Sequence, residues 1–197
     1  MADGTLKVGT ITTSSGSGTI TLGQSGETVN VAGTLQSGGS PIIQGITEAD
    51  MWRINSAFSG AVDPITSNWE RADTDNFAVL GTGLSESSGI FSFPSTGYYL
   101  ITFVASFVKN GDNRGIGVGI KLTTNNSSYS DLAYSATFIQ QTESDSTTAT
   151  ASVNAIAHCT DVSNVKISFN AGGTGVNTNG SSTFQETGFT CVKLADT

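Results

Sequence analysis

The chain is poor in histidine, cysteine and charge. Its 197 residues include one histidine and two cysteines, and charged residues make up only 12%. One histidine and two cysteines without a CxxC spacing cannot supply the ligands of a structural zinc site. Two cysteines are also too few for a disulfide scaffold. We therefore expect Cys159 and Cys191 to be buried free thiols, with a bridge between neighbouring strands as the alternative.

Basic residues are scarce as well. Eight Lys and Arg face sixteen Asp and Glu, so the formal net charge is −8. No basic cluster is present that could follow a phosphate backbone or an anionic membrane surface, which argues against nucleic-acid and membrane partners. No apolar run is long enough to insert into a membrane, and the first residues form no apolar leader. The sequence therefore predicts a protein made in the cytoplasm.

Catalytic motifs are also missing. No P-loop, GxGxxG, HExxH or GxSxG pattern occurs. His158 and Cys159 are adjacent, and adjacent residues of a strand point to opposite faces, so they cannot act together as base and nucleophile. The sequence thus predicts assembly and binding rather than catalysis, with no cofactor. A depolymerase with a carboxylate pair in a groove is the enzymatic alternative.

Two short Asp/Asn clusters, at 73–76 and 110–113, are the candidates for calcium. Neither matches an EF-hand loop, and Asp and Asn are common in turns for conformational reasons. We interpret both as turns without a metal, while a bound calcium ion stays open.

Gly, Ser, Thr and Asn dominate what is present, together with Val, Ile and ten Phe. This composition favours strands and turns over helices and predicts an all-β fold. The character of the chain changes near residue 46. Residues 1–45 contain GTL and GTI repeats, with period-two alternation at 19–22 and 28–31, and residues 37–41 have the composition of a hinge. We interpret 1–45 as an extended stalk or anchoring segment, which either intertwines with its own copies or forms a flexible tail; the regular alternation favours intertwining.

Residues 46–62 contain the best helical pattern in the chain. The run TEADMWRINSAF places Met51, Ile54 and Phe58 on one helical face, and Thr47 can cap its start. We therefore expect a short helical neck here.

Residues 63–197 are expected to form the head. Strand-like runs separated by turn residues occur at 77–80, 89–93, 98–108, 115–122, 132–139, 148–157, 165–169 and 184–194. Eight such runs predict a β-sandwich or barrel. In the run 98–107, one face is apolar throughout, and the other carries Tyr98, Leu100 and Val104. A solvated outer face is normally polar, so this face should be covered by another subunit or by another segment of the chain, such as the N-terminal segment folding back.

Two motifs resemble the C1q/TNF family. They are GIFSFPSTGYYLITF at 89–103, which contains a Pro-x-x-Gly turn, and STFQETGFTCVKL at 182–194. The resemblance implies a jelly-roll sandwich that trimerises about a threefold axis and has no catalytic residues. The interface residues that follow from it and from the strand pattern are Tyr98, Leu100, Val104, Phe184 and Phe189.

The N-terminal run GTITLGQSGETVNVAGT at 18–34 is similar to stalk segments of marine phage tail-fibre and virion-associated proteins, and SESSGIF at 85–91 looks like heads of such proteins. This implies a virion location and a homotrimeric appendage, tail-fibre-like or head-fibre, held to other virion proteins by its N-terminal segment. The head would bind a glycan or protein on the host surface through loop residues Asn110, Asp112, Asn125, Tyr129, Asn177 and Asn179. A capsid decoration or cement protein that binds no receptor is the alternative.

Overall fold

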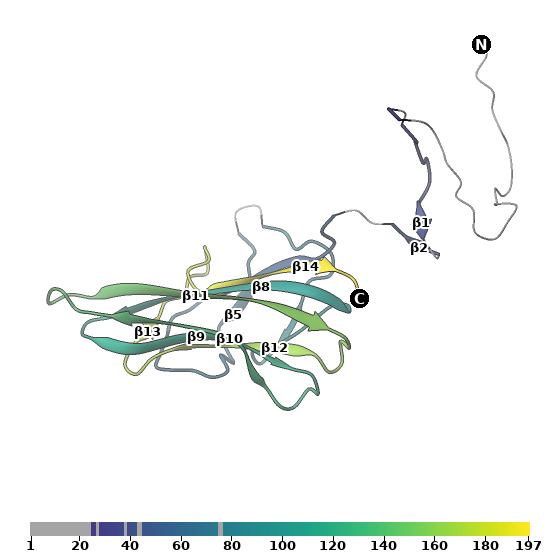
Figure 1. Cartoon of the computed structure of the whole chain (residues 1–197). Helices are drawn as coiled ribbons and strands as arrows, with labels where there is room; N and C mark the ends of the chain where they lie inside the picture. The colour runs from purple at the N-terminus through teal and green to yellow at the C-terminus, as the bar shows by residue number, and fades with distance from the viewer. Residues whose placement is uncertain (1–24, 27, 38, 43–44, 75–76) are drawn as a thin grey trace, which may run out of the picture. The chain divides into compact units, whose positions relative to one another are not determined.

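The computed structural model describes residues 25–26, 28–37, 39–42, 45–74 and 77–197. Contacts divide the chain into two compact units, Met1–Gln44 and Gly45–Thr197. All ordered elements in the described ranges are strands, and no helix occurs among them (Figure 1). The prediction of an all-β fold is confirmed.

In the described part of the first unit, the ordered element is a small hairpin. Strand β1 (Gln36–Ser37) pairs antiparallel with β2 (Ser40–Pro41). The turn between them uses Gly39 at a φ of 86°, a conformation that favours glycine. The predicted hinge at 37–41 is therefore a tight turn.

The strand predicted at 28–31 is wrong, since these residues form no strand. Val29 and Val31 are exposed, because no partner strand pairs with them within the described residues. The strand predicted at 19–22 lies outside the described residues.

The second unit is a sandwich of two antiparallel sheets. One sheet has the order β10-β9-β12-β7-β6; its strands are β6 (Ser85–Ser87), β7 (Ile90–Ser92), β9 (Asn113–Thr123), β10 (Ser130–Ile139) and β12 (Lys166–Gly172). The other has the order β4-β13-β8-β14-β3-β5, with β11 on the remaining side of β8; its strands are β3 (Ala49–Ile54), β4 (Phe58–Ser59), β5 (Trp69–Arg71), β8 (Gly97–Lys109), β11 (Thr147–Cys159), β13 (Asn177–Thr178) and β14 (Gly188–Ala195). This is the jelly-roll sandwich that the sequence predicts.

Strand β8 is the central strand of the second sheet and follows its alternation along its length. The side chains of Tyr99, Ile101, Phe103, Ala105 and Phe107 are all buried in the core. β11 pairs with β8 over thirteen residues, from Thr147 opposite Lys109 to Cys159 opposite Gly97. The apolar inner face predicted for this run is therefore confirmed.

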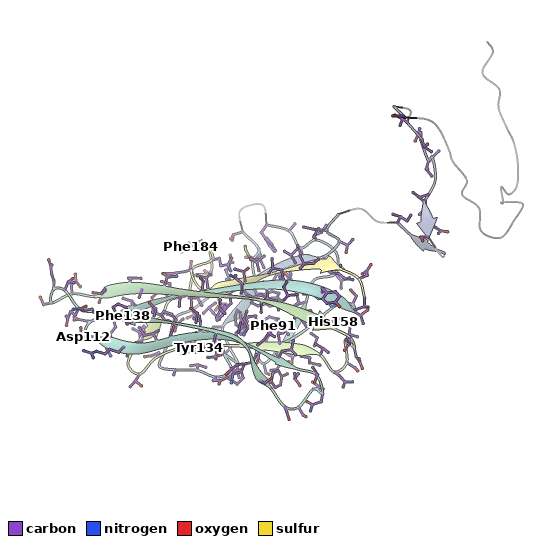
Figure 2. All side chains as sticks on the ribbon, in the orientation of Figure 1. Phe91, Asp112, Tyr134, Phe138, His158 and Phe184 are labelled. Carbon is purple, nitrogen blue, oxygen red and sulfur yellow. The ribbon has the colours of Figure 1, made fainter. Side chains whose placement is uncertain are left out.

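An aromatic cluster between the two sheets forms the centre of the core. Phe91 of the first sheet makes edge-on contacts with Trp52, Trp69 and Phe189 of the second, at centroid distances of 5.2, 5.1 and 4.8 Å. Such contacts contribute about 0.5–1.5 kcal/mol per pair beyond area burial. The cluster therefore joins the two layers, and Figure 2 shows Phe91 in the interior.

The helix predicted between residues 46 and 62 is wrong, because this segment contains β3 and β4 instead. Asp50, Trp52 and Ile54 are buried at alternating positions, and Arg53 is buried as well. β3 completes the sheet between β14 and β5, so the hydrogen bonds of two neighbouring strands outweigh about three turns of marginal helix. The charged side chains of Asp50 and Arg53 are only 1% exposed.

The long strands give this unit two ends (Figure 1). The near end is the one at Gly97 of β8: Tyr98 pairs there with Ala195, and Val192 of β14 pairs with both Leu100 and Ala49, where β3 begins. The far end is the one at Lys109, where the loops 110–112 and 140–146 connect the strands. The segment that leads into the unit and the C-terminus therefore share the near end.

Candidate functional site

The outer face of the β11-β8-β14 sheet carries exposed apolar side chains at the near end. Ile156 lies opposite Leu100, and Leu100 lies opposite Val192 on the other side. Leu100 is 37% exposed and Ile156 58%. In the next row, the ring of Tyr98 stacks on His158 at 4.2 Å with an interplanar angle of 8°. These side chains form one continuous surface, the apolar face, made up of Tyr98, Leu100, Ile156, His158 and Val192.

Toward the far end, the same chain covers this side of β8. Ser106 donates its backbone N–H to Thr187 and its hydroxyl to Glu186, while Asn179 donates to both the carbonyl and the hydroxyl of Ser106. Val104 is half-buried beside this contact. The outer face of this half of β8 is therefore covered by other segments of the same chain, at residues 179 and 186–187.

The remaining two predicted interface residues, Phe184 and Phe189, differ in burial. Phe184 is 59% exposed, in the loop before β14, and projects outward in Figure 2. Phe189 is fully buried and stacks on Phe169 at 4.3 Å, because it occupies an inward position of β14. Placing Phe189 at an interface is therefore wrong; it is a core residue.

A second set of exposed apolar side chains lies on edge strand β10. Leu132 sits at an irregularity in the pairing between Asp131 and Ala133, and Tyr134 is 61% exposed. The Tyr134 ring lies across Gly117, where an added Cβ would come 2.4 Å from its hydroxyl oxygen. The glycine therefore makes room for the ring to lie over the sheet.

The neighbouring strand β9 is charged near the same end. Lys121 forms a 2.5 Å ion pair with Asp63 and a longer one, at 3.8 Å, with Asp131. The hydrogen bond to Asp63 is the main reason that the pKa of Lys121 lies above its ordinary value. The outer side of this sheet is thus more polar than the apolar face.

Asn110 and Asp112, two of the predicted receptor-facing residues, lie at the far end. Both are exposed in the loop between β8 and β9. Asn110 accepts a hydrogen bond from the Gln141 side chain at 2.5 Å, and Asp112 accepts one from the Gln141 backbone at 2.8 Å. These bonds hold the 110–112 loop against the 140–146 loop.

Asn125 and Tyr129 lie at the near end instead, in the loop between β9 and β10. The Asn125 side-chain oxygen accepts hydrogen bonds from the backbones of Ser127 and Ser128, so it shapes its own loop. Tyr129 is half-buried, and burial raises the pKa of its hydroxyl. The six predicted loop residues therefore do not form a single surface.

Asn177 and Asn179 belong to β13 and the residue just after it. Asn177 is exposed and pairs with Val108 near the far end. Asn179, by contrast, uses its side chain to bind Ser106 at 3.1 Å, so its role is structural. Its sequence context alone, in a run of Asn, Ser and Gly, carried no signal that would separate it from Asn177.

The residues considered as catalytic or metal-binding candidates either lie apart or already have a partner in the fold. His158 is exposed on the apolar face, whereas Cys159 is buried on the opposite side of β11, and burial raises the pKa of its thiol. Asp73, from the first calcium candidate, forms an ion pair with Arg53 at 2.6 Å. Across the part of the chain that the structure describes, no group of three or more His, Cys, Asp or Glu side chains could hold a metal ion. In that same part, no helix is long and apolar enough to cross a membrane.

A cavity lies at the far end. It has a volume of about 370 Å³ and is lined by Asp112, Arg114, Phe138, Ile139 and Gln140. Of these residues, Asp112 is one of the six predicted receptor-facing residues, and Arg114 and Gln140 fall in ranges, 109–114 and 140–147, that the sequence also indicates as recognition loops. Arg114 and Phe138 come from strand positions, and their proximity depends on the pairing of β9 with β10, which the sequence does not state.

No family model and no curated protein matches the chain. Solved structures do match, among them one described as the structure of Eiger TNF from S. frugiperda. That chain is 17% identical; the alignment covers 76% of this chain and 93% of that one, with a TM-score of 0.54. At this identity the likeness concerns the fold alone. In fold, the chain is therefore similar to a TNF protein, which agrees with the C1q/TNF-like jelly roll that its two motifs predict.

Proposed function

We propose that this chain is a structural appendage of a bacteriophage virion, that it forms a homotrimer, and that its head binds the host surface. Residues 1–45 would hold it to other virion proteins, and no catalytic reaction is assigned to it. Its virion origin rests on the likeness of residues 18–34 and 85–91 to phage stalks and heads.

The apolar face is the observation that carries the proposal. Tyr98, Leu100 and Ile156 are exposed side by side on the outer face of a sheet. Contiguous exposed apolar surface of this kind is typical of interaction sites, because leaving it in water costs about 25 cal/mol for each Å². A neighbouring molecule that covers it would recover this free energy.

Further copies of the same chain are the occupant we propose. The apolar face lies on one side of the near end, and the exposed side chains of Leu132 and Tyr134 lie on edge strand β10. When the apolar face of one copy contacts edge strand β10 of the next, the interface is heterologous. A closed ring of copies then covers every apolar face. We propose three copies because the C1q/TNF family that the two motifs resemble forms trimers.

The two ends of the head suit a presented binding domain. Residue 45 leads into the near end through Ala49, whereas the loops 110–112 and 140–146 lie at the far end. Loops on a rigid sandwich are common binding sites because the scaffold fixes them and they tolerate variation. We therefore assign host contact to the far end, and to Asn110 and Asp112 rather than Asn125 or Tyr129.

Three measurements test this proposal. Light scattering of the full chain should give three times its mass of 20.2 kDa. Labelled antibodies against the head should decorate phage particles, and the purified chain should compete with particles for adsorption to host cells. A monomer would contradict the trimer. Labelling of the capsid without any effect on adsorption would contradict host binding and indicate a decoration protein.

A further inference from the structure

The far-end cavity has the size and lining of a small-ligand site. Its volume of about 370 Å³ falls within the range of natural ligand pockets, roughly 300–1,000 Å³. Its lining combines a cation, Arg114, an acid, Asp112, and an aromatic ring, Phe138. Figure 2 shows Phe138 and Asp112 together at one end of the sandwich, away from His158 at the other.

A β-bulge builds this cavity. Ile139 pairs with Asn113 and Thr137 pairs with Ile116, so Phe138 alone faces two residues, Arg114 and Gly115. A bulge of this kind redirects side chains and is frequent near binding sites. An added Cβ on Gly115 would meet nothing within 4 Å, so the backbone there borders open space.

Hydrogen bonds fix the loops around the cavity. The backbone N–H of Gln141 donates to Asp112, and the Gln141 side chain donates to Asn110. These bonds join the turn after β8 to the chain after β10, next to the cavity-lining residues Asp112, Arg114 and Gln140. A site that is held in place loses less conformational entropy when a ligand binds.

The charges at the cavity point to an acidic ligand with hydroxyl groups. Arg114 is exposed and forms no ion pair with any other described residue. A guanidinium binds a carboxylate through two parallel hydrogen bonds. Asp112 uses one carboxylate oxygen for Gln141, which leaves the other to accept a hydroxyl, and the Gln140 amide can donate or accept.

The exposed ring adds an apolar contact. Phe138 is 64% exposed, although it borders the cavity, whereas its neighbour Ile139 is buried. A flat ring beside polar groups matches the apolar C–H face of a pyranose, whose hydroxyls and carboxylate lie around its rim. We propose that this cavity binds a carboxylated sugar of a surface polysaccharide, with Arg114 on the carboxylate and Phe138 under the ring.

This inference rests on the proposed host-binding function and names the class of ligand. Calorimetry of the full chain would use three probes: galacturonic acid trisaccharide, glucuronic acid and N-acetylneuraminic acid. At least one should bind, and the methyl ester of that probe should bind roughly tenfold more weakly, since a charge-assisted pair is lost.

Variants would locate the site. Arg114→Gln and Phe138→Ala should each weaken binding by about tenfold or more, and Arg114→Lys should fall between, because it keeps the charge but loses the planar fork. Lys166→Gln removes the same charge from β12 at the near end and should bind as the wild type does. Unchanged thermal unfolding and mass would show that each variant is folded.

Two results would overturn the inference. One is the absence of binding by all three probes; the other is an equal loss in Arg114→Gln and Lys166→Gln, which would mean a general charge effect. If the chain still competes for adsorption while no carboxylated sugar binds, the ligand class is wrong and the host-binding role stands. If sugar binds but the particles carry no label, the site stands and the virion role fails.

Discussion

Single aromatic residues differ sharply in their contribution to stability. Phe91 is fully buried and contacts the rings of Trp52, Trp69 and Phe189. We expect Phe91→Ala to lower the free energy of unfolding by about 3–5 kcal/mol, since it removes a large side chain and leaves a cavity. Phe184→Ala, at an exposed position, should change it by less than about 1 kcal/mol in the isolated chain. Urea denaturation at one fixed chain concentration compares the two, and equal losses would contradict this account of the core.

The buried thiol of Cys191 should make stability depend on alkaline pH. Burial, assisted by the charge of Asp50, raises the pKa of Cys191 well above its ordinary value. As the pH rises past about 8.5, the unfolded chain therefore loses this proton before the folded chain does. The contribution of the protonated thiol to the free energy of unfolding is therefore full below about pH 8.5. Above it, this contribution falls by up to about 1.4 kcal/mol for each pH unit.

The measurement is urea denaturation of the wild type and Cys191→Ala between about pH 7.5 and 9.5, around the ordinary thiol pKa. The variant loses packing at every pH, so the informative quantity is the difference in slope. The wild type should lose stability more steeply with rising pH than the variant. Parallel slopes would mean that the thiol does not remain protonated in the folded chain.

The burial of charged residues is a feature that the sequence does not indicate. Arg53 is 1% exposed because Glu70 and Asp73 form ion pairs with it and Thr74 and the Ser182 carbonyl accept its other hydrogen bonds. These partners lie up to 129 positions away in the chain. A charged residue in an isolated segment is expected to be exposed to solvent unless its partners are known, so the burial of Arg53 could not be predicted from the local sequence.

At the scale of elements, the turn between β6 and β7 is a sharp test. Ser88 and Gly89 have positive φ values of 53° and 79° and join two strands directly, which is the geometry of a type I′ turn. A Cβ on Gly89 would lie 2.0 Å from the Ile65 carbonyl oxygen. We expect Gly89→Ala to cost about 2 kcal/mol or more, from backbone strain and this clash.

A neighbouring substitution serves as the control for this turn. Ser88 is exposed, and Asn tolerates a positive φ better than Ser does, so Ser88→Asn should be neutral or stabilise by up to about 0.5 kcal/mol. Thermal unfolding of both variants measures the difference. If Gly89→Ala unfolds like the wild type, the turn does not have this conformation.

The long strands of the second unit were largely predictable, but the run at 77–80 forms no strand, and the other exceptions have two causes. Long alternating runs, such as the one that became β8, carry a period-two signal that is independent of context. β3 was mistaken for a helix because Met51, Ile54 and Phe58 happen to lie at helical spacing, while its true alternation includes the buried Asp50. Strands as short as β5 and β13 exist only through their neighbours, so no local pattern indicates them.

At the scale of the molecule, the two apolar sides of β8 were predictable, but the division of its outer face was not. The chain itself covers Ser106 through Asn179 and Thr187, which are distant in sequence. Only the near-end half, at Tyr98 and Leu100, remains exposed. The contact between Arg114 and Phe138 at the far-end cavity could not be predicted either, since these residues meet through a bulge whose register is a property of the folded sheet.

The exposed half of that face gives the final prediction. If three copies cover it, Leu100→Lys and Ile156→Lys should each shift the full chain from trimer toward monomer, because each buries a charge without a partner at the contact. Both side chains are exposed in the single chain, so the fold itself should be stable to either change. Light scattering across a dilution series measures the mass, and circular dichroism checks the fold.

Thr148→Lys is the matched control, since Thr148 is also an exposed residue of β11 but pairs with Val108 at the far end. It adds the same charge and should leave the trimer intact. A trimer in all three variants would place the contact elsewhere, and dissociation in all three would reflect net charge rather than the apolar face. Dissociation in the two near-end variants alone would tie assembly to Leu100 and Ile156, which lie opposite each other and are exposed in the single chain.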